Sequence, residues 1–261
     1  MSGKVFLVGA GPGSVDLLTL RAARLIETAD VILYDALIGT EILQLAKQNA
    51  RLVNVGKRCG KKSLSQDDIN AMLIYWARSG ETVVRLKGGD PGIFGRGAEE
   101  GAALRAANIE VEIIPGVTAA CSAAAAAGIS LTDRNAASEA IFATAHHREG
   151  SSGCGLESVA RQGRTLVLYM PGHDYDHIVA ELREAGLAGD TPCVIVSKIG
   201  SPDQQVAFTN LYLLASGAAL PSPAVLIVGE VARNPFGEAG DFVQGAPGQH
   251  WPSSEEDQLT A

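Results

Sequence analysis

The sequence predicts an α/β protein with two α/β domains, the first containing a mostly parallel sheet and the second a mixed sheet. Over residues 1–115, short β-branched runs alternate with amphipathic stretches, which is typical of a parallel sheet covered by helices. Over residues 116–233, strand-like runs follow one another with fewer helices between them, which favours some antiparallel pairing. Residues 234–261 are rich in Gly, Pro, Ser and acidic residues, so we expect a disordered tail.

In the N-terminal domain, strands are expected at 5–9, 31–34, 51–55, 82–86 and 111–115. Apolar residues at helical spacing predict helices over 14–29 and 40–48, and a further helix from about Ala98. Ser65, with Asp68 three residues later, forms a capping-box pattern. The helix that follows should run to about Ser79, where Gly80 ends it.

In the C-terminal domain, the Ala-rich stretch 118–128 suits a tightly packed, buried helix, with a low-complexity segment as the alternative. Strands are expected at 141–145, 165–170, 193–197, 205–209 and 224–231. Two further helices are expected around 156–162 and 174–186, and the stretch 148–155 is expected to be a flexible loop.

Composition excludes several classes of protein. The formal net charge of −8 argues against nucleic acid as the main partner. No apolar run reaches 18 residues, so we expect no membrane span. The N-terminus lacks a secretory signal pattern and enters a strand almost at once, so a cytoplasmic location is expected.

Neither a metal site nor a disulfide framework is expected. The chain has four cysteines, far apart and without C-x-x-C spacing: Cys59, Cys121, Cys154 and Cys193. His173 and His177 lie four residues apart and could share a helix face, but no third ligand clusters with them.

The loop after the first strand, GAGPGS, is similar to the G-x-G-x-x-G dinucleotide fingerprint. Ser14 stands at the third glycine position, and Pro12 removes an N–H from a loop meant to bind a pyrophosphate. Asp35 ends the second strand, where a ribose-binding acid would lie. An NAD-dependent oxidoreductase is therefore an alternative, but the loop alone supports it weakly.

A second glycine-rich segment, VVRLKGGDPGIFGRGAEE, occupies residues 83–100 and follows the fourth strand. Ligands collect at the carboxyl ends of parallel strands, and glycines let the backbone approach them closely. Asp90 could accept a hydrogen bond from an ammonium or hydroxyl group of such a ligand. The alternative is a tight strand-to-helix turn without a ligand.

Five motifs occur in order along the chain: GAGPG, YD, VGKR, RLKGGDPGIFGRGAEE and PGVTAA. Together they resemble the tetrapyrrole methylases, and most closely the uroporphyrinogen-III C-methyltransferases. The resemblance spans about residues 4–232 and continues through LTDR, TLVLYM, TPCVIV and PAVLIVGEV. The sequence departs from the family pattern at Gly92, Asp133 and Ala145.

The resemblance implies two α/β domains that enclose a cleft, S-adenosyl-L-methionine as methyl donor, and a homodimer. It implies methylation of uroporphyrinogen III at C-2 and C-7 to give precorrin-2. Two alternatives are a methyltransferase that acts on a later corrin precursor and a non-catalytic sensor that binds S-adenosylmethionine or a tetrapyrrole.

Position by position, the resemblance implies a set of cofactor contacts at Pro12, Gly88, Gly89, Asp90, Ile93, Thr118, Ala119, Met170 and Ile199. For the last of these, the neighbouring Gly200 is the alternative. Asp35 corresponds to the family's proton acceptor and Lys57 to its proton donor. From the residues alone, Asp35 could instead cap the next helix, and Lys57 could hold a substrate carboxylate.

Uroporphyrinogen carries eight carboxylates, so an acidic enzyme needs local basic groups where this substrate docks. The run KRCGKK at 57–62 is basic at four of its six positions and contains no acid. Arg85, Arg96 and Arg134 lie at expected strand or loop ends and could add to it. A solvated loop is the alternative for KRCGKK.

Overall fold

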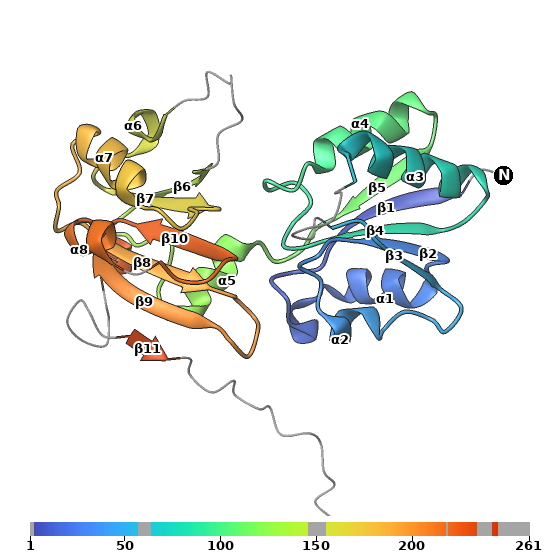
Figure 1. The fold of residues 1–261 in the computed structure, drawn as a ribbon, viewed down its shortest axis with the longest axis horizontal. Coiled ribbons are helices and arrows are strands. Elements are labelled where there is room, and N and C mark those ends of the chain that lie inside the picture. The colour runs from blue at the N-terminus through green and yellow to red at the C-terminus, as the bar shows by residue number, and fades with distance from the viewer. Residues whose placement is uncertain (1–2, 57–63, 146–154, 218, 234–241, 245–261) are drawn as a thin grey trace, which may run out of the picture.

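The computed structural model describes residues 3–56, 64–145, 155–217, 219–233 and 242–244. The chain forms two sheets, each with its own helices, and the segment that leads into α5 (Ala119–Ala126) connects them (Figure 1). This arrangement confirms the predicted fold class. The domain limits at residues 115 and 233 stay predictions.

The first sheet contains β1 (Lys4–Gly9), β2 (Val31–Tyr34), β3 (Arg51–Asn54), β4 (Val83–Lys87) and β5 (Glu110–Ile114). Its strand order is β3-β2-β4-β1-β5, and every pair is parallel. All five carboxyl ends therefore meet at one edge, where ligands collect in such sheets. The residues of β4 are buried throughout, since the strand lies at the centre.

Helices cover both faces of this sheet (Figure 1). On one face, α1 (Leu20–Thr28) and α2 (Thr40–Leu43) pack through apolar side chains onto β1, β2 and β4. On the other face, α3 (Gln66–Arg78) and α4 (Gly97–Ala106) do the same. The α3 capping box is confirmed, because the Asp68 N–H donates to the Ser65 hydroxyl at 3.1 Å and the Ser65 N–H donates to the Asp68 carboxylate at 2.9 Å.

Three predicted helices are shorter than expected: those over 14–29 and 40–48, and the one around 156–162, which ends at Val159. The stretch 14–29 begins with a 3₁₀ turn, η1 (Val15–Leu17), and α1 starts only at Leu20. The reason is Thr19, whose hydroxyl accepts the N–H of Ala22 and caps the helix there. The predicted helix over 40–48 is helical only as far as Leu43.

The second sheet contains β6 (Glu139–Thr144), β7 (Arg164–Tyr169), β8 (Pro192–Ser197), β9 (Gln205–Asn210), β10 (Ala224–Val228) and β11 (Phe242–Gln244). Its order is β11-β9-β8-β10-β7-β6; β6 and β7 are parallel and the other pairs are antiparallel. The prediction of a mixed sheet is confirmed. The strand β11 lies within the stretch that composition predicts to be disordered, where it pairs with β9.

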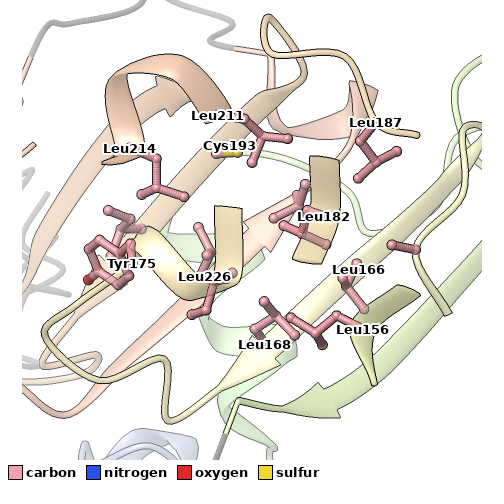
Figure 2. Close-up of a cluster of buried hydrophobic side chains, with 14 of the residues drawn as sticks. Leu156, Leu166, Leu168, Tyr175, Leu182, Leu187, Cys193, Leu211, Leu214 and Leu226 are labelled. Atoms are coloured by element: carbon pink, nitrogen blue, oxygen red, sulfur yellow. The ribbon is translucent and has the colours of Figure 1, made fainter. Parts of the chain in front are cut away.

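The helices of this half lie on opposite faces of the sheet. Helix α5 packs its alanines against one face. The other face is covered by α6 (Leu156–Val159), α7 (Asp176–Glu184) and α8 (Leu211–Ser216), whose leucines form a continuous apolar cluster (Figure 2). Sequence analysis missed α8, although Asn210 caps it by accepting the Leu213 N–H at 3.0 Å. A short 3₁₀ turn, η2 (Glu230–Ala232), follows β10. Among the described residues, no helix is both long and apolar enough to cross a membrane.

Candidate active site

Three glycine-containing loops meet at the carboxyl edge of the first sheet. Gly11 and Gly89 exchange backbone hydrogen bonds of 2.7 and 3.2 Å, which joins the loops after β1 and β4. A Cβ atom on Gly116 would lie 2.3 Å from the Gly89 carbonyl oxygen, and one on Gly9 would lie 2.5 Å from the Gly116 nitrogen. Only glycine allows this approach. Three motifs that are far apart in sequence thus form one backbone surface.

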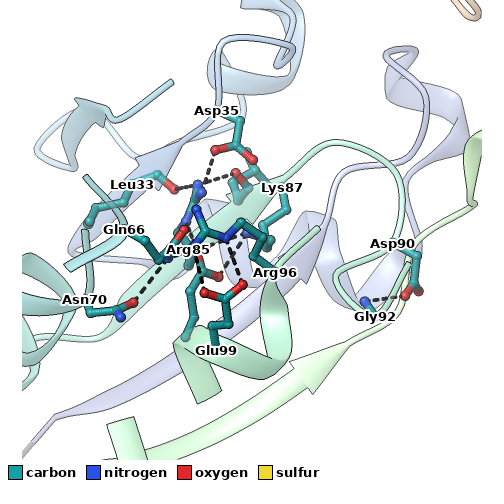
Figure 3. Close-up of polar contacts among 12 residues, drawn as sticks. Leu33, Asp35, Gln66, Asn70, Arg85, Lys87, Asp90, Gly92, Arg96 and Glu99 are labelled. Atoms are coloured by element: carbon teal, nitrogen blue, oxygen red, sulfur yellow. Dashed lines mark hydrogen bonds and ion pairs between the residues drawn. The ribbon is translucent and has the colours of Figure 1, made fainter. Parts of the chain in front are cut away.

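Asp90 fastens two of these loops together. One carboxylate oxygen accepts the Gly92 N–H at 2.7 Å (Figure 3), and the other accepts the Gly116 N–H at 3.0 Å. The sequence suggested Asp90 as an acceptor for a ligand. The structure shows that both oxygens already accept backbone hydrogen bonds, so Asp90 also fixes the shape of the loop.

The loop after β1 also contacts the second half of the molecule. A Cβ atom on Gly200 would lie 3.5 Å from the Pro12 carbonyl carbon and 3.3 Å from the Ser14 nitrogen. A Cβ atom on Gly13 would lie 3.5 Å from the Ile199 carbonyl oxygen. The predicted contacts Pro12 and Ile199, which come from different sheets, are therefore brought together, and Gly200 lies beside them.

Tyr169, the last residue of β7, connects further predicted contacts. Its hydroxyl lies 2.6 Å from the Thr118 hydroxyl and accepts the Ala120 N–H at 3.1 Å. Its ring lies 4.9 Å from that of Phe94, which follows the predicted contact Ile93. Burial raises the pKa of the Tyr169 phenol, although the hydrogen bond to Thr118 opposes the shift, so the hydroxyl stays protonated at neutral pH.

Several residues around these loops have strained backbone conformations. Four non-glycine residues near the meeting point of the two halves have positive φ angles: Phe94, Arg96, Met170 and Lys198. Such residues persist only where the surrounding structure holds them, and they cluster at functional sites. Met170 follows Tyr169 directly and is 51% exposed. Met170 thus presents an apolar side chain to solvent, directly after the residue that contacts Thr118.

A buried group of charges lies beneath Asp35 (Figure 3). Asp35 follows β2, and its Oδ1 lies 2.5 Å from Nη2 of Arg85 in β4. The Nε of Arg85 lies 3.0 Å from Oε1 of Glu100 in α4, and Nζ of Lys87 lies 2.9 Å from Oε2 of Glu100. The group contains two cations and two anions, so its formal charge is zero. This neutrality makes its burial tolerable.

Further contacts hold this group in place. Glu100 is 0% exposed, and Arg85 and Lys87 are each 3% exposed, whereas the Asp35 side chain is 29% exposed. The Gln66 amide donates to Glu100 at 3.3 Å. Burial lowers the pKa of the Lys87 ammonium, and the Arg85 charge lowers it further, while Glu100 opposes the shift. Asp35 is thus the exposed end of an otherwise buried network.

Two sequence interpretations are corrected here. Arg85 is not a surface cation available to a substrate, because it is buried and bonded to Asp35 and Glu100. Asp35 does not cap the next helix, because the N-cap of α2 is Gly39. Arg96 is exposed and forms a bidentate pair with Glu99 at 2.8 and 2.6 Å, as Figure 3 shows.

Sequence analysis missed Glu100 and Lys87. The available signal was two cations, Arg85 and Lys87, at alternate positions of an otherwise apolar central strand. Alternate strand residues share one face, so both need a buried anion from the covering helix. Lys57 and the whole KRCGKK run lie outside the described residues.

Other features of the described chain do not add to the site. No group of three or more His, Cys, Asp or Glu among the described residues could hold a metal ion. A cavity of about 570 Å³ lies at the opposite end of the second sheet, next to Arg164, Thr191 and Val228. None of the predicted cofactor contacts lines it.

Comparison with known proteins gives consistent results. The family described as Tetrapyrrole (Corrin/Porphyrin) Methylases matches residues 4–215. The siroheme synthase of Actinobacillus pleuropneumoniae serotype 7 (strain AP76) is 46% identical over 232 residues, which make up 88% of this chain and 48% of that protein. The chain therefore spans about half the length of the curated relatives it matches.

Solved structures agree with this result. The uroporphyrin-III-C-methyltransferase of Thermus thermophilus is 41% identical with a TM-score of 0.75, covering 89% of this chain and 94% of that one. Its complex with S-adenosyl homocysteine gives a TM-score of 0.76 at 37% identity, covering 88% and 94%. A cobalamin biosynthetic enzyme, cobalt precorrin-4 methyltransferase, gives 0.78 at 28% identity, covering 88% and 95%.

Proposed function

Because this chain belongs to the tetrapyrrole methylase family, we propose that it is an S-adenosylmethionine-dependent C-methyltransferase that converts uroporphyrinogen III to precorrin-2 by methylation at C-2 and C-7. The observation that carries this proposal is Asp35, a carboxylate at the ligand-binding edge of the first sheet that a buried arginine holds in one orientation. The proposal includes a cytoplasmic location and a homodimer. Light scattering of the purified protein, which gives the molar mass in solution, would test the homodimer.

The loops that meet at this edge fit S-adenosylmethionine. Gly88 and Gly89 offer backbone groups from the first half of the molecule, while Thr118 at the start of α5, Met170 and Ile199 belong to the second half. The apolar Met170 side chain suits a ligand with an adenine ring. When bound, S-adenosylmethionine supplies an electrophilic methyl group on a sulfonium.

Asp35 is the proposed general base. Methylation of a pyrrole carbon leaves positive charge on the substrate ring, which proton loss relieves. Oδ1 of Asp35 accepts from Arg85, and among the described residues none donates a hydrogen bond to Oδ2. Oδ2 therefore accepts the substrate proton, which a well-placed base accelerates by about 10²–10⁴-fold. The positive Arg85 keeps the carboxylate turned toward the edge of the sheet.

Basic side chains are needed to bind the substrate's carboxylates. Arg85 is committed to Asp35 and Glu100, so the proposal assigns this role to the KRCGKK run at 57–62, together with exposed Arg96. Arg134 is left out, because its neighbours Asn135 and Ala136 line the cavity at the opposite end of the second sheet. In this assignment Lys57 either delivers a proton or holds one substrate carboxylate. The hypothesis rests on sequence and charge, since 57–63 lie outside the described residues.

A later corrin precursor is the second candidate substrate, favoured by the similarity to cobalt precorrin-4 methyltransferase. That likeness is weaker in sequence than the likeness to the siroheme synthases and to the Thermus enzyme, so uroporphyrinogen III is preferred. A sensor that only binds would have no need of a base held as Asp35 is.

The proposal is tested by incubating the purified chain with S-adenosylmethionine and enzymatically prepared uroporphyrinogen III, followed by mass spectrometry of the products. We expect a gain of two methyl groups. A parallel incubation with precorrin-2 tests the second candidate. Methyl gain on precorrin-2 alone would overturn the substrate assignment, and binding of S-adenosylhomocysteine without methyl gain on either substrate would favour the sensor.

A further inference from the structure

Tyr169 lies where three separate segments of the proposed cofactor site meet. Its ring packs against Phe94 at 4.9 Å, in the loop after β4, and against Phe142 at 6.0 Å, in β6. Its hydroxyl reaches the start of α5, and its backbone leads directly into the strained Met170. A single side chain from the second sheet thus contacts both the loop after β4 of the first sheet and the start of α5.

The hydroxyl of Tyr169 organises the first turn of α5. Helix N-termini leave backbone N–H groups without intrahelical partners, and the N-cap residue normally satisfies one of them. Here the N-cap is Thr118, whose side chain makes no capping hydrogen bond within the helix. Instead Tyr169 accepts the Ala120 N–H at 3.1 Å and lies 2.6 Å from the Thr118 hydroxyl. Tyr169, in β7, therefore supplies the acceptor for the first turn of α5 that the N-cap side chain does not supply.

We propose that Tyr169 is a positioning residue for the cofactor, which acts by holding Thr118 and Ala119 in place through its hydroxyl group. This inference rests on the proposed function, because it assumes that Thr118 and Ala119 contact S-adenosylmethionine. Tyr169 is buried, so it acts through these two residues and not by exposure to the ligand. The Phe94 contact extends the same hold to the segment that contains Ile93.

The alternative is that Tyr169 only fills the apolar core between α5 and the second sheet. Tyr169→Phe separates the two roles, because phenylalanine keeps the ring and removes only the hydroxyl. The matched control is Tyr175→Phe, since Tyr175 is also a buried tyrosine of the second half but packs on the opposite face of the sheet, in the cluster of Figure 2.

The experiment is calorimetric titration of the full chain with S-adenosylhomocysteine, with unfolding temperatures measured in parallel. We expect Tyr169→Phe to weaken binding about tenfold, because it leaves buried polar groups without a partner. Tyr175→Phe should bind within about twofold of the wild type. In turnover, Tyr169→Phe should raise the KM for S-adenosylmethionine about tenfold and leave kcat within about twofold.

A second pair of variants covers the case in which Tyr169→Phe does not fold. Thr118→Val should weaken binding to a similar degree, and Thr118→Ser, which keeps the hydroxyl, should restore it. Unchanged affinity in Tyr169→Phe, or an equal loss in Tyr175→Phe, would overturn the inference while leaving the proposed function intact. Absence of binding by the wild type would instead overturn both.

Discussion

Arg85 and Asp35 form an ion pair that joins the buried interior of the first sheet to its carboxyl edge, with Nη2 and Oδ1 2.5 Å apart. The arginine is 3% exposed, and its Nε is paired with Glu100, which is fully buried. Because Arg85 is itself held by Glu100, the Asp35 carboxylate that pairs with it loses little further freedom when a substrate arrives. The pair thus orients the proposed base in advance.

Removing the buried anion should destabilise the fold. In Glu100→Gln, Arg85 and Lys87 lose their shared buried counter-charge, so we expect the free energy of unfolding to fall by about 3–5 kcal/mol. The double variant Lys87→Met/Glu100→Gln should recover part of the loss, because a single cation then remains, with Asp35 as its partner. Urea denaturation measures both; equal stability of Glu100→Gln and wild type would contradict this account.

The contact between the glycine loops should be sensitive to one added carbon. Gly116→Ala places a Cβ 2.3 Å from the Gly89 carbonyl oxygen, so the loops must separate. We expect at least a tenfold loss of S-adenosylhomocysteine affinity. The control is Gly39→Ala, whose Cβ would lie 3.5 Å from the Gly13 oxygen at an ordinary φ of −66°. The idea fails if the two variants bind this ligand equally well.

Asp30 should contribute stability that depends on pH. A hydrogen bond from Lys47, and a second from the Thr82 N–H, lower the pKa of the Asp30 carboxyl below its ordinary value. Its stabilisation is therefore complete above the unfolded pKa of about 3.9 and is lost as pH falls through the lower folded value.

Asp30→Asn keeps an acceptor for the Thr82 N–H but removes the charge. The Asp30 side chain is 36% exposed, so solvent screens the ion pair. We expect a loss of at most about 1 kcal/mol at pH 7. Denaturant unfolding from pH 7 downward should show this difference shrinking below about pH 4. A difference that stayed constant into acid would argue against the ion pair.

The basic run should act on substrate affinity and not on the cofactor. Lys61→Glu/Lys62→Glu reverses two charges of KRCGKK, so a substrate with many carboxylates should show a strongly raised KM. The affinity for S-adenosylhomocysteine should equal that of the wild type. Lys4→Glu offers a control, since Lys4 lies at the amino end of β1, opposite the site, and pairs with Glu110. An unchanged KM for the substrate in Lys61→Glu/Lys62→Glu would contradict the hypothesis.

Local patterns predicted most of the fold. Every strand of the first sheet was predicted within about one residue, because β-branched runs bounded by turn residues are a strong signal. The capping box of Ser65 and Asp68 was predicted from the three-residue spacing of these two side chains. The helix start at Leu20 was missed because apolar spacing continues through Val15 and Leu17, while the decisive Thr19 cap interrupts it only weakly.

The site was predicted from the order of its motifs, but its supporting contacts were not. Residues such as Pro12 and Ile199 lie in different halves of the chain, and only the fold brings them together. The hydrogen bond from the Ala120 N–H of α5 to the Tyr169 hydroxyl, and the pairing of Glu100 with Arg85, join elements with no sequence signature for their contact. Such long-range partners depend on topology and not on local pattern.

The most direct test of the central claim is the rate of methyl transfer by Asp35→Asn. The asparagine keeps the size of the side chain and a carbonyl oxygen for Arg85 but cannot accept the substrate proton as a base. We expect kcat to fall by about 10²–10⁴-fold, with S-adenosylhomocysteine affinity within about twofold of the wild type. The exposed Asp174→Asn serves as control and should keep full activity. Methyl transfer by Asp35→Asn at the wild-type rate would contradict the claim that Asp35 takes the proton.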